Sequence, residues 1–122
     1  MRIFKNKAFS RWVKEQKLTD LSLKKAIQEI GDGLYEANLG GSLFKKRIIL
    51  GNRGKSSGAR TIVAFKLNNS AFFIYGFAKN ERSNITLREE HALKALAKVY
   101  FSYNEKQINR AIEMGELIEV LL

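Results

Sequence analysis

The stretch RTIVAFKLNNSAFFIYGFA, residues 60–78, contains two runs of apolar and β-branched side chains separated by Asn68-Asn69-Ser70. Residues of this kind favour extended strands, and the short polar segment between them is typical of a tight hairpin. We therefore predict two strands, Arg60–Leu67 and Ala71–Ala78. Because the connection is so short, the two strands are expected to pair antiparallel.

Side chains alternate between the two faces of a strand, so the first run predicts one apolar face and one mixed face. The apolar face would carry Thr61, Val63, Phe65 and Leu67. The mixed face would carry Arg60, Ile62, Ala64 and Lys66. Helices are expected to cover the apolar face, and the mixed face is expected to stay open.

A third strand, Leu43–Leu50, is predicted upstream, after a bend at Gly40 and Gly41 and before the loop Gly51–Gly58. Within it, Lys45 and Arg47 lie two residues apart and therefore share a face. If the register allows, these two cations and Arg60 converge on the open face of an antiparallel meander.

Two short strands and four helices complete the predicted elements, the helices from the helical spacing of their apolar residues. They are a short strand Arg2–Lys5, the helices Ala8–Lys17 and Leu21–Ile30, the helices Leu87–Ser102 and Asn104–Met114, and a last strand Glu116–Leu121. The predicted fold is α+β: a small antiparallel sheet with an N-terminal helical hairpin packed on one face and a C-terminal helical tail. At this length, residues 1–122 are expected to form a single domain.

Composition narrows the class of protein. The chain has no Cys and a single His, His91, which argues against disulfides, Cys-based zinc sites and His-rich metal sites. It contains no apolar run of the roughly 18–20 residues that span a bilayer. We therefore expect a cytoplasmic protein that uses no metal and no cofactor and does not contact a membrane.

The net charge of +10 favours an anionic partner, and its distribution is uneven. No Asp or Glu occurs from Ala37 to Asn80. The basic residues of this segment are Lys45, Lys46, Arg47, Arg53, Lys55, Arg60, Lys66 and Lys79. Ordinary solvated surfaces intersperse both signs of charge, so this segment is expected to meet nucleic-acid phosphates.

Simpler interpretations of the same residues exist. Lys45 and Lys46 could belong to a charged edge strand that prevents aggregation. Gly54-Lys55-Ser56 suggests a nucleotide-binding P-loop, but Ile49 stands where that motif requires Gly, and a strand follows instead of a helix. A loop with several glycines and the cations Arg53 and Lys55 is better suited to wrapping a phosphodiester backbone.

Three motifs in order resemble the RelE/ParE superfamily, specifically RelE-type and related HigB-type toxins. They are Phe44-Lys45-Lys46-Arg47, Ser57-Gly58-Ala59-Arg60 and Ala78-Lys79-Asn80-Glu81-Arg82-Ser83. The resemblance covers about residues 1–96. It implies a toxin that cleaves mRNA, typically on the ribosome, and that is neutralised by an antitoxin encoded by a neighbouring gene.

The chemistry implied by the resemblance is metal-independent attack of a ribose 2′-hydroxyl on its own phosphorus. That reaction needs a proton acceptor, stabilisation of the phosphorane charge and a proton donor for the leaving oxygen. By position in the motifs, Lys45 and Arg47 match the basic strand residues, Lys45 as the candidate base, and Arg60 matches the arginine that clamps the phosphate.

The pattern departs from RelE at two positions. Asn80 stands where RelE has a second Arg, for which Lys79 or Arg82 would substitute, and Thr86 stands where RelE has a Tyr. The predicted catalytic residues are Lys45, Arg47, Arg60, Lys79 and Arg82. The predicted RNA-binding residues are Lys46, Arg53, Lys55, Tyr75 and Asn80.

Two alternative functions remain open. A ParE-like protein would inhibit gyrase by binding it and would cleave nothing. A plain basic module would bind RNA or DNA with a steep dependence on salt and leave mRNA intact.

Overall fold

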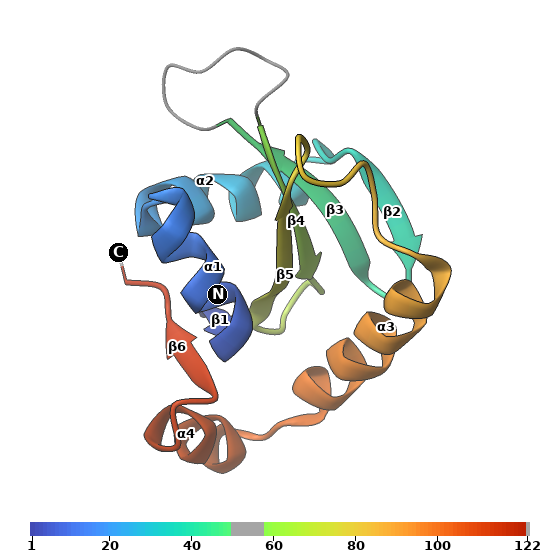
Figure 1. The fold of residues 1–122 in the computed structure, drawn as a ribbon. Coiled ribbons are helices and arrows are strands. Elements are labelled where there is room, and N and C mark those ends of the chain that lie inside the picture. The colour runs from blue at the N-terminus through green and yellow to red at the C-terminus, as the bar shows by residue number, and fades with distance from the viewer. Residues whose placement is uncertain (50–57, 122) are drawn as a thin grey trace.

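The computed structural model describes residues 1–49 and 58–121 (Figure 1). Its elements are β1 (Ile3–Asn6), α1 (Lys7–Gln16), α2 (Asp20–Gly31), β2 (Ala37–Gly40), β3 (Leu43–Ile48), β4 (Ala59–Ala64), β5 (Ala71–Ala78), α3 (Leu87–Ser102), α4 (Glu105–Glu113) and β6 (Leu117–Glu119). Within the described residues, the strands form one sheet in the order β2-β3-β4-β5-β1-β6. Neighbouring strands are antiparallel except that β1 runs parallel to β5.

The predicted α+β class and the antiparallel meander of β3, β4 and β5 are confirmed. The bounds of β5 and α3 agree with the prediction, whereas β4 ends three residues early, at Ala64. The edge strand β2 was not predicted, because Ala37–Gly40 contains no β-branched residue. Gly41 and Ser42 connect β2 to β3 with positive φ angles of 62° each, which is the geometry of a tight hairpin turn.

Helices cover both faces of the sheet, so the expectation of an open face is wrong in part. On one face, α1 and α2 pack on Val63 and Phe73. On the other, α3 and α4 pack on Ile62 and Phe72. Figure 1 shows the central strands between the α1–α2 pair and α3. The reason is that the C-terminal helices have apolar faces of their own, which must be removed from water.

The helical hairpin approaches β5 closely at Gly76. A Cβ atom at this position would lie 2.3 Å from the Trp12 ring, a distance that side chains do not tolerate. Gly76 therefore lets the indole of α1 rest directly on the backbone of β5. This contact gives the glycine of the Tyr75-Gly76-Phe77 motif a packing role and fixes α1 against the sheet.

One buried side chain joins the first strand, the first helix and β5. Asn6 is the N-cap of α1, where its Oδ1 accepts a hydrogen bond from Phe9 N at 2.8 Å. Its Nδ2 donates to Ile74 O at 3.0 Å. The register between β4 and β5 shifts at this point, between Ile62 and Val63. The asparagine therefore caps a helix and satisfies a carbonyl beside an irregularity of the sheet.

No helix in the described part of the chain has both the length and the apolar character needed to cross a membrane.

We predict that Asn6→Ala lowers the free energy of unfolding by about 2–3 kcal/mol, because it removes a helix cap and leaves a buried carbonyl without its donor. Thr19→Ala is the matched control. Thr19 caps α2 through an exposed hydrogen bond to Ser22 N, so its loss should cost only about 1 kcal/mol. Urea unfolding of both variants measures the difference, and equal losses would show that the bond to Ile74 contributes nothing.

Candidate functional site

The register between β3 and β4 brings the three predicted cations together. Arg47 lies directly opposite Arg60, and Lys45 lies opposite Ile62. Opposed residues of antiparallel strands project from the same face, as do residues two apart along one strand. Lys45, Arg47 and Arg60 therefore share the face that carries α3 and α4, in agreement with the predicted alternation. We call these three side chains the cation cluster.

The cluster occupies the end of this face that the helices do not fill. Arg60 is opposite Phe77 near the end of β5, whereas α3 packs on residues such as Phe72 at the start of that strand. Arg60 is nevertheless deeply buried, with a side chain 6% exposed, and the Lys45 side chain is 13% exposed. The site is thus a largely enclosed group of positive charges at one end of an otherwise apolar face.

Gly58 lies where the two arginines meet. A Cβ atom built at Gly58 would lie 3.0 Å from Arg47 Nε and 3.4 Å from Arg60 Nη1. Both guanidinium groups therefore reach the same point beside the backbone that leads into β4. Any larger residue at this position would push at least one of them away, which gives a physical reason for glycine in the Ser57-Gly58-Ala59-Arg60 motif.

A carboxylate lies against the cluster. Glu36, the residue before β2, places Oε2 2.6 Å from Arg60 Nε and Oε1 3.6 Å from Lys45 Nζ. Its backbone N–H donates to Lys45 O at 2.8 Å, so the edge strand holds it in register with β3. Like charges at close range repel, and this anion offsets part of that repulsion.

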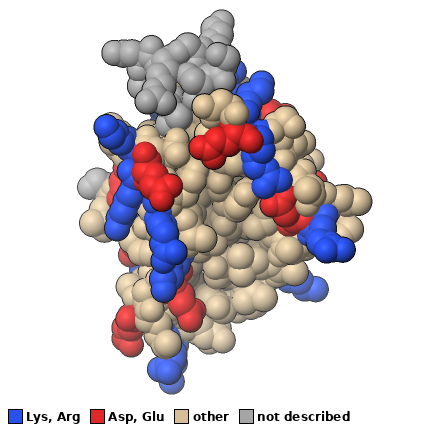
Figure 2. Space-filling model, viewed as in Figure 1, with Lys and Arg blue, Asp and Glu red and all other residues tan. Residues whose placement is uncertain are grey.

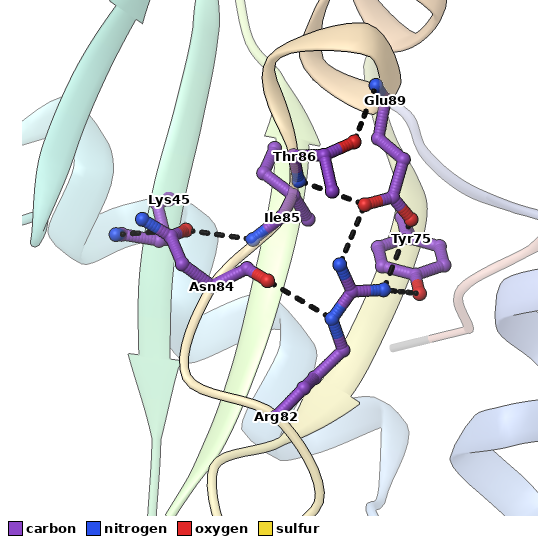
Figure 3. Close-up of polar contacts among 7 residues, drawn as sticks. All are labelled: Lys45, Tyr75, Arg82, Asn84, Ile85, Thr86 and Glu89. Atoms are coloured by element: carbon purple, nitrogen blue, oxygen red, sulfur yellow. Dashed lines mark hydrogen bonds and ion pairs between the residues drawn. The ribbon is translucent and has the colours of Figure 1, made fainter.

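The segment between β5 and α3 is fixed by Arg82 (Figure 3). The Arg82 guanidinium donates to both carboxylate oxygens of Glu89, at 2.9 and 2.5 Å, and to the Tyr75 hydroxyl at 3.0 Å. Its Nε donates to Asn84 O at 2.9 Å. Asn84 in turn accepts a hydrogen bond from Lys45 Nζ through its side-chain oxygen, at 3.4 Å. The network therefore runs from the start of α3 to the cation cluster.

Glu89 also completes the N-terminal cap of α3. Its carboxylate accepts from Thr86 N, while its own N–H donates to Thr86 Oγ1, which together form a capping box. The hydrogen bond from Arg82, followed by that from the Thr86 backbone, lowers the pKa of Glu89 from 4.5 to about 2. The carboxylate therefore stays charged, and the network stays paired, throughout the physiological pH range.

A scan against models of protein families matches residues 1–120 to the RelE toxin of the RelE/RelB toxin–antitoxin system. The chain belongs to this RelE toxin family. It is therefore the toxin of a toxin–antitoxin pair, and the family implies an antitoxin as its partner. A search of curated proteins gives no match.

In the toxin, Lys46 lies apart from the other predicted site residues. Lys46 lies between Lys45 and Arg47 along β3 and therefore points to the opposite face, under the helical hairpin. There its Nζ lies 3.2 Å from Glu29 Oε1 and donates to Leu34 O at 2.9 Å. It stabilises the contact between α2 and β3 and is not part of the cation cluster.

Three predicted residues lie at the end of β5. Lys79 and Asn80 are exposed, and the Lys79 N–H donates to Gly58 O at 3.4 Å, which puts this segment beside the cluster. Tyr75 is half-buried, with its hydroxyl on Arg82. Arg82 itself is engaged by Glu89. Arg53 and Lys55 lie outside the described residues.

Two residues of the site were not predicted, Glu36 and Asn84. Glu36 is the last acidic residue before the acid-free segment, a signal that has meaning only once β2 is known to pair with β3. Nothing in the sequence marks Asn84. Among the described residues, no three His, Cys, Asp or Glu side chains are grouped closely enough to hold a metal ion.

Acidic side chains from outside the acid-free segment also break up the basic surface. On the face shown in Figure 2, red acidic groups lie beside blue basic ones, and no continuous basic area forms. On this face, therefore, the basic residues do not form a broad surface of one sign.

We predict that Gly58→Ala displaces Arg47 and destabilises the toxin by about 1 kcal/mol, because the new methyl group meets Arg47 Nε at 3.0 Å. The Nε–H resonances of the two arginines in NMR spectra report the displacement. Gly31→Ala is the control, since its methyl group would make only an ordinary contact, 3.6 Å from Phe65. Unchanged Nε–H resonances in Gly58→Ala would show that the arginines do not need this glycine.

We predict that Glu89 titrates near pH 2 in the folded toxin, as measured by NMR of its carboxyl carbon. A carboxyl with a lowered pKa stabilises the fold fully above its unfolded pKa and loses that effect as the pH falls towards the folded value. The stability difference between wild type and Glu89→Gln should therefore shrink between about pH 4.5 and pH 2. In Arg82→Met the titration should move upward, and an unmoved midpoint would exclude Arg82 as the cause.

Proposed function

We propose that the protein is an endoribonuclease that cleaves ribosome-bound mRNA without a metal ion and thereby inhibits translation. In this reaction the ribose 2′-hydroxyl attacks the adjacent phosphorus, and the products are a 2′,3′-cyclic phosphate and a free 5′-hydroxyl. The observation that carries the proposal is that Lys45, Arg47 and Arg60 share one face of β3 and β4, where Arg47 and Arg60 meet at Gly58. Membership of the RelE toxin family supports it.

The cluster suits a phosphate in the act of substitution. A phosphorane carries more negative charge than the diester from which it forms, and fixed cations in a water-poor site stabilise that extra charge without reorganising. Arg60 has a planar fork that matches two phosphate oxygens, and its buried Nη1 has no hydrogen-bond partner among the described residues. An unpaired buried donor costs free energy, which a ligand oxygen would recover.

The other predicted residues take different parts in this proposal. Lys79 and Asn80, exposed beside Gly58, would contact the RNA backbone next to the scissile phosphate. Arg82 acts indirectly in this scheme, because Glu89 occupies its guanidinium. It holds Asn84, and with it Lys45, in place.

The test uses purified toxin and ribosomes programmed with a short mRNA, with the RNA ends mapped after incubation. Cleavage that leaves a 2′,3′-cyclic phosphate would support the proposal. Inhibition of gyrase with intact mRNA would instead indicate a ParE-like inhibitor. Salt-sensitive binding of RNA or DNA, without cleavage or loss of translation, would indicate a plain nucleic-acid-binding module.

We predict that Arg60→Ala reduces cleavage by about 10²- to 10³-fold and relieves growth arrest, because it removes the main phosphate donor. Arg60→Lys should recover only part of the activity, since an ammonium keeps the charge and loses the fork. Arg2→Gln is the control, because Arg2 pairs with Glu119 and lies beside the start of β5, at the opposite end from Arg60. Circular dichroism checks that each variant folds. A folded Arg60→Ala protein as toxic as wild type would exclude the cluster.

A further inference from the structure

Glu36 lies at the outer side of the cation cluster and is not explained by binding of a phosphate. Its side chain is 35% exposed, whereas those of Arg60 and Lys45 are 6% and 13% exposed. Glu36 is therefore the most exposed side chain of the three. The backbone fixes the position of Glu36, because its N–H donates a hydrogen bond to Lys45 O and the next residue, Ala37, pairs with Lys45 in the sheet.

The proposed reaction needs a group that accepts the proton of the 2′-hydroxyl. A guanidinium cannot do so, because it carries only donors and stays charged. Lys45 faces the site as a donor, with its Nζ directed to Asn84 Oδ1 and to the Glu36 carboxylate. A carboxylate has two oxygens with several acceptor positions, and the contacts with Arg60 and Lys45 use only part of them.

Arg60 can serve Glu36 and a phosphate at the same time. Its Nε contacts the carboxylate at 2.6 Å, while its Nη1 is buried without a hydrogen-bond partner in the part of the chain that the structure describes. The two nitrogens belong to one rigid planar group but lie on different edges of it, so the carboxylate on Nε leaves Nη1 available to a second acceptor. One side chain would thus hold a phosphate oxygen and the proton acceptor at fixed positions in the same site, as a reaction between a phosphate and its neighbouring hydroxyl requires.

We propose that Glu36 is the general base of this reaction, an inference that rests on the nuclease activity proposed above. The carboxylate takes the 2′-hydroxyl proton as the bond from O2′ to phosphorus forms and the bond from phosphorus to O5′ breaks. The leaving O5′ takes a proton from a water molecule, and Glu36 then returns its proton to solvent, so protons balance over the cycle.

Proton transfer to Glu36 also changes the net charge of the site at the step in which the phosphorane forms. Before transfer, the carboxylate offsets part of the positive charge of Lys45 and Arg60. After transfer it is neutral, and these cations act undiminished on the phosphorane that has just formed. The site therefore stabilises the transition state more strongly than the bound substrate, which is the condition for catalysis.

The experiment compares wild type with Glu36→Gln, Glu36→Asp and Glu36→Ala in single-turnover cleavage on programmed ribosomes. Glu36→Gln keeps the size of the side chain and should cleave about 10²- to 10⁴-fold more slowly. It should bind ribosomes carrying a 2′-deoxy mRNA at least as tightly as wild type, because one negative charge is gone. Glu36→Asp, which keeps the carboxylate but withdraws it, should give an intermediate rate.

Two further measurements separate a base from a structural residue. Formate should restore cleavage by Glu36→Ala in proportion to its concentration, whereas chloride at the same ionic strength should not. The matched control is Glu29→Gln, which removes the carboxylate paired with the neighbouring Lys46 on the opposite face and should cleave like wild type. The Glu29 side chain is 37% exposed and that of Glu36 is 35% exposed, so the two variants differ mainly in which face of the sheet loses a carboxylate.

Three results would contradict the proposal, and each would have a different meaning. If Glu36→Gln cleaves as fast as wild type or faster, the carboxylate competes with phosphate and is not the base. If 2′-deoxy mRNA binding is lost together with cleavage, and formate does not rescue Glu36→Ala, the carboxylate only positions Arg60. If wild type itself leaves mRNA intact, the proposed nuclease activity fails, whatever the variants do.

Discussion

A charged side chain buried in a sheet must be paired, and in this protein that requirement falls on Arg60. Strand β4 is buried along its whole length, and Arg60 is the charged residue within it. Leaving such a charge without a counter-ion costs several kcal/mol, so the fold supplies Glu36 at 2.6 Å. The pair links the start of β2 to β4 across β3, and so joins the edge of the sheet to its centre beside the site.

The helices on both faces determine how much of the sheet a ligand could reach. Because α3 and α4 pack on Ile62 and Phe72, the apolar part of their face is closed. Among the described residues, what remains uncovered is the end where β3 finishes and β4 begins, bounded by the segment that Arg82 holds through Glu89 and Asn84. The site is therefore small and set in one place, which suits recognition of one phosphate better than non-specific binding along a strand.

Much of the fold could be predicted from local pattern. The apolar runs in residues 60–78 identified the central hairpin, alternation identified the faces of its first strand, and helical spacing identified all four described helices. The sharing of a face by Lys45 and Arg47 followed from the strand period alone, and their convergence with Arg60 needed only the antiparallel register. These features depend on contacts between near neighbours in the chain, which leave a periodic signal.

The partners of the cations could not be predicted in this way. Glu36 reaches Arg60 across two intervening strand pairings, and Asn84 reaches Lys45 from a segment 39 residues away. The motif marks Arg82 as a candidate catalytic residue, yet the start of α3 brings Glu89 onto it. The sequence thus specified which residues carry charge and which way the strand side chains face. Folding decided which charges meet, because ion pairs between distant segments depend on how whole elements pack and leave no periodicity along the chain.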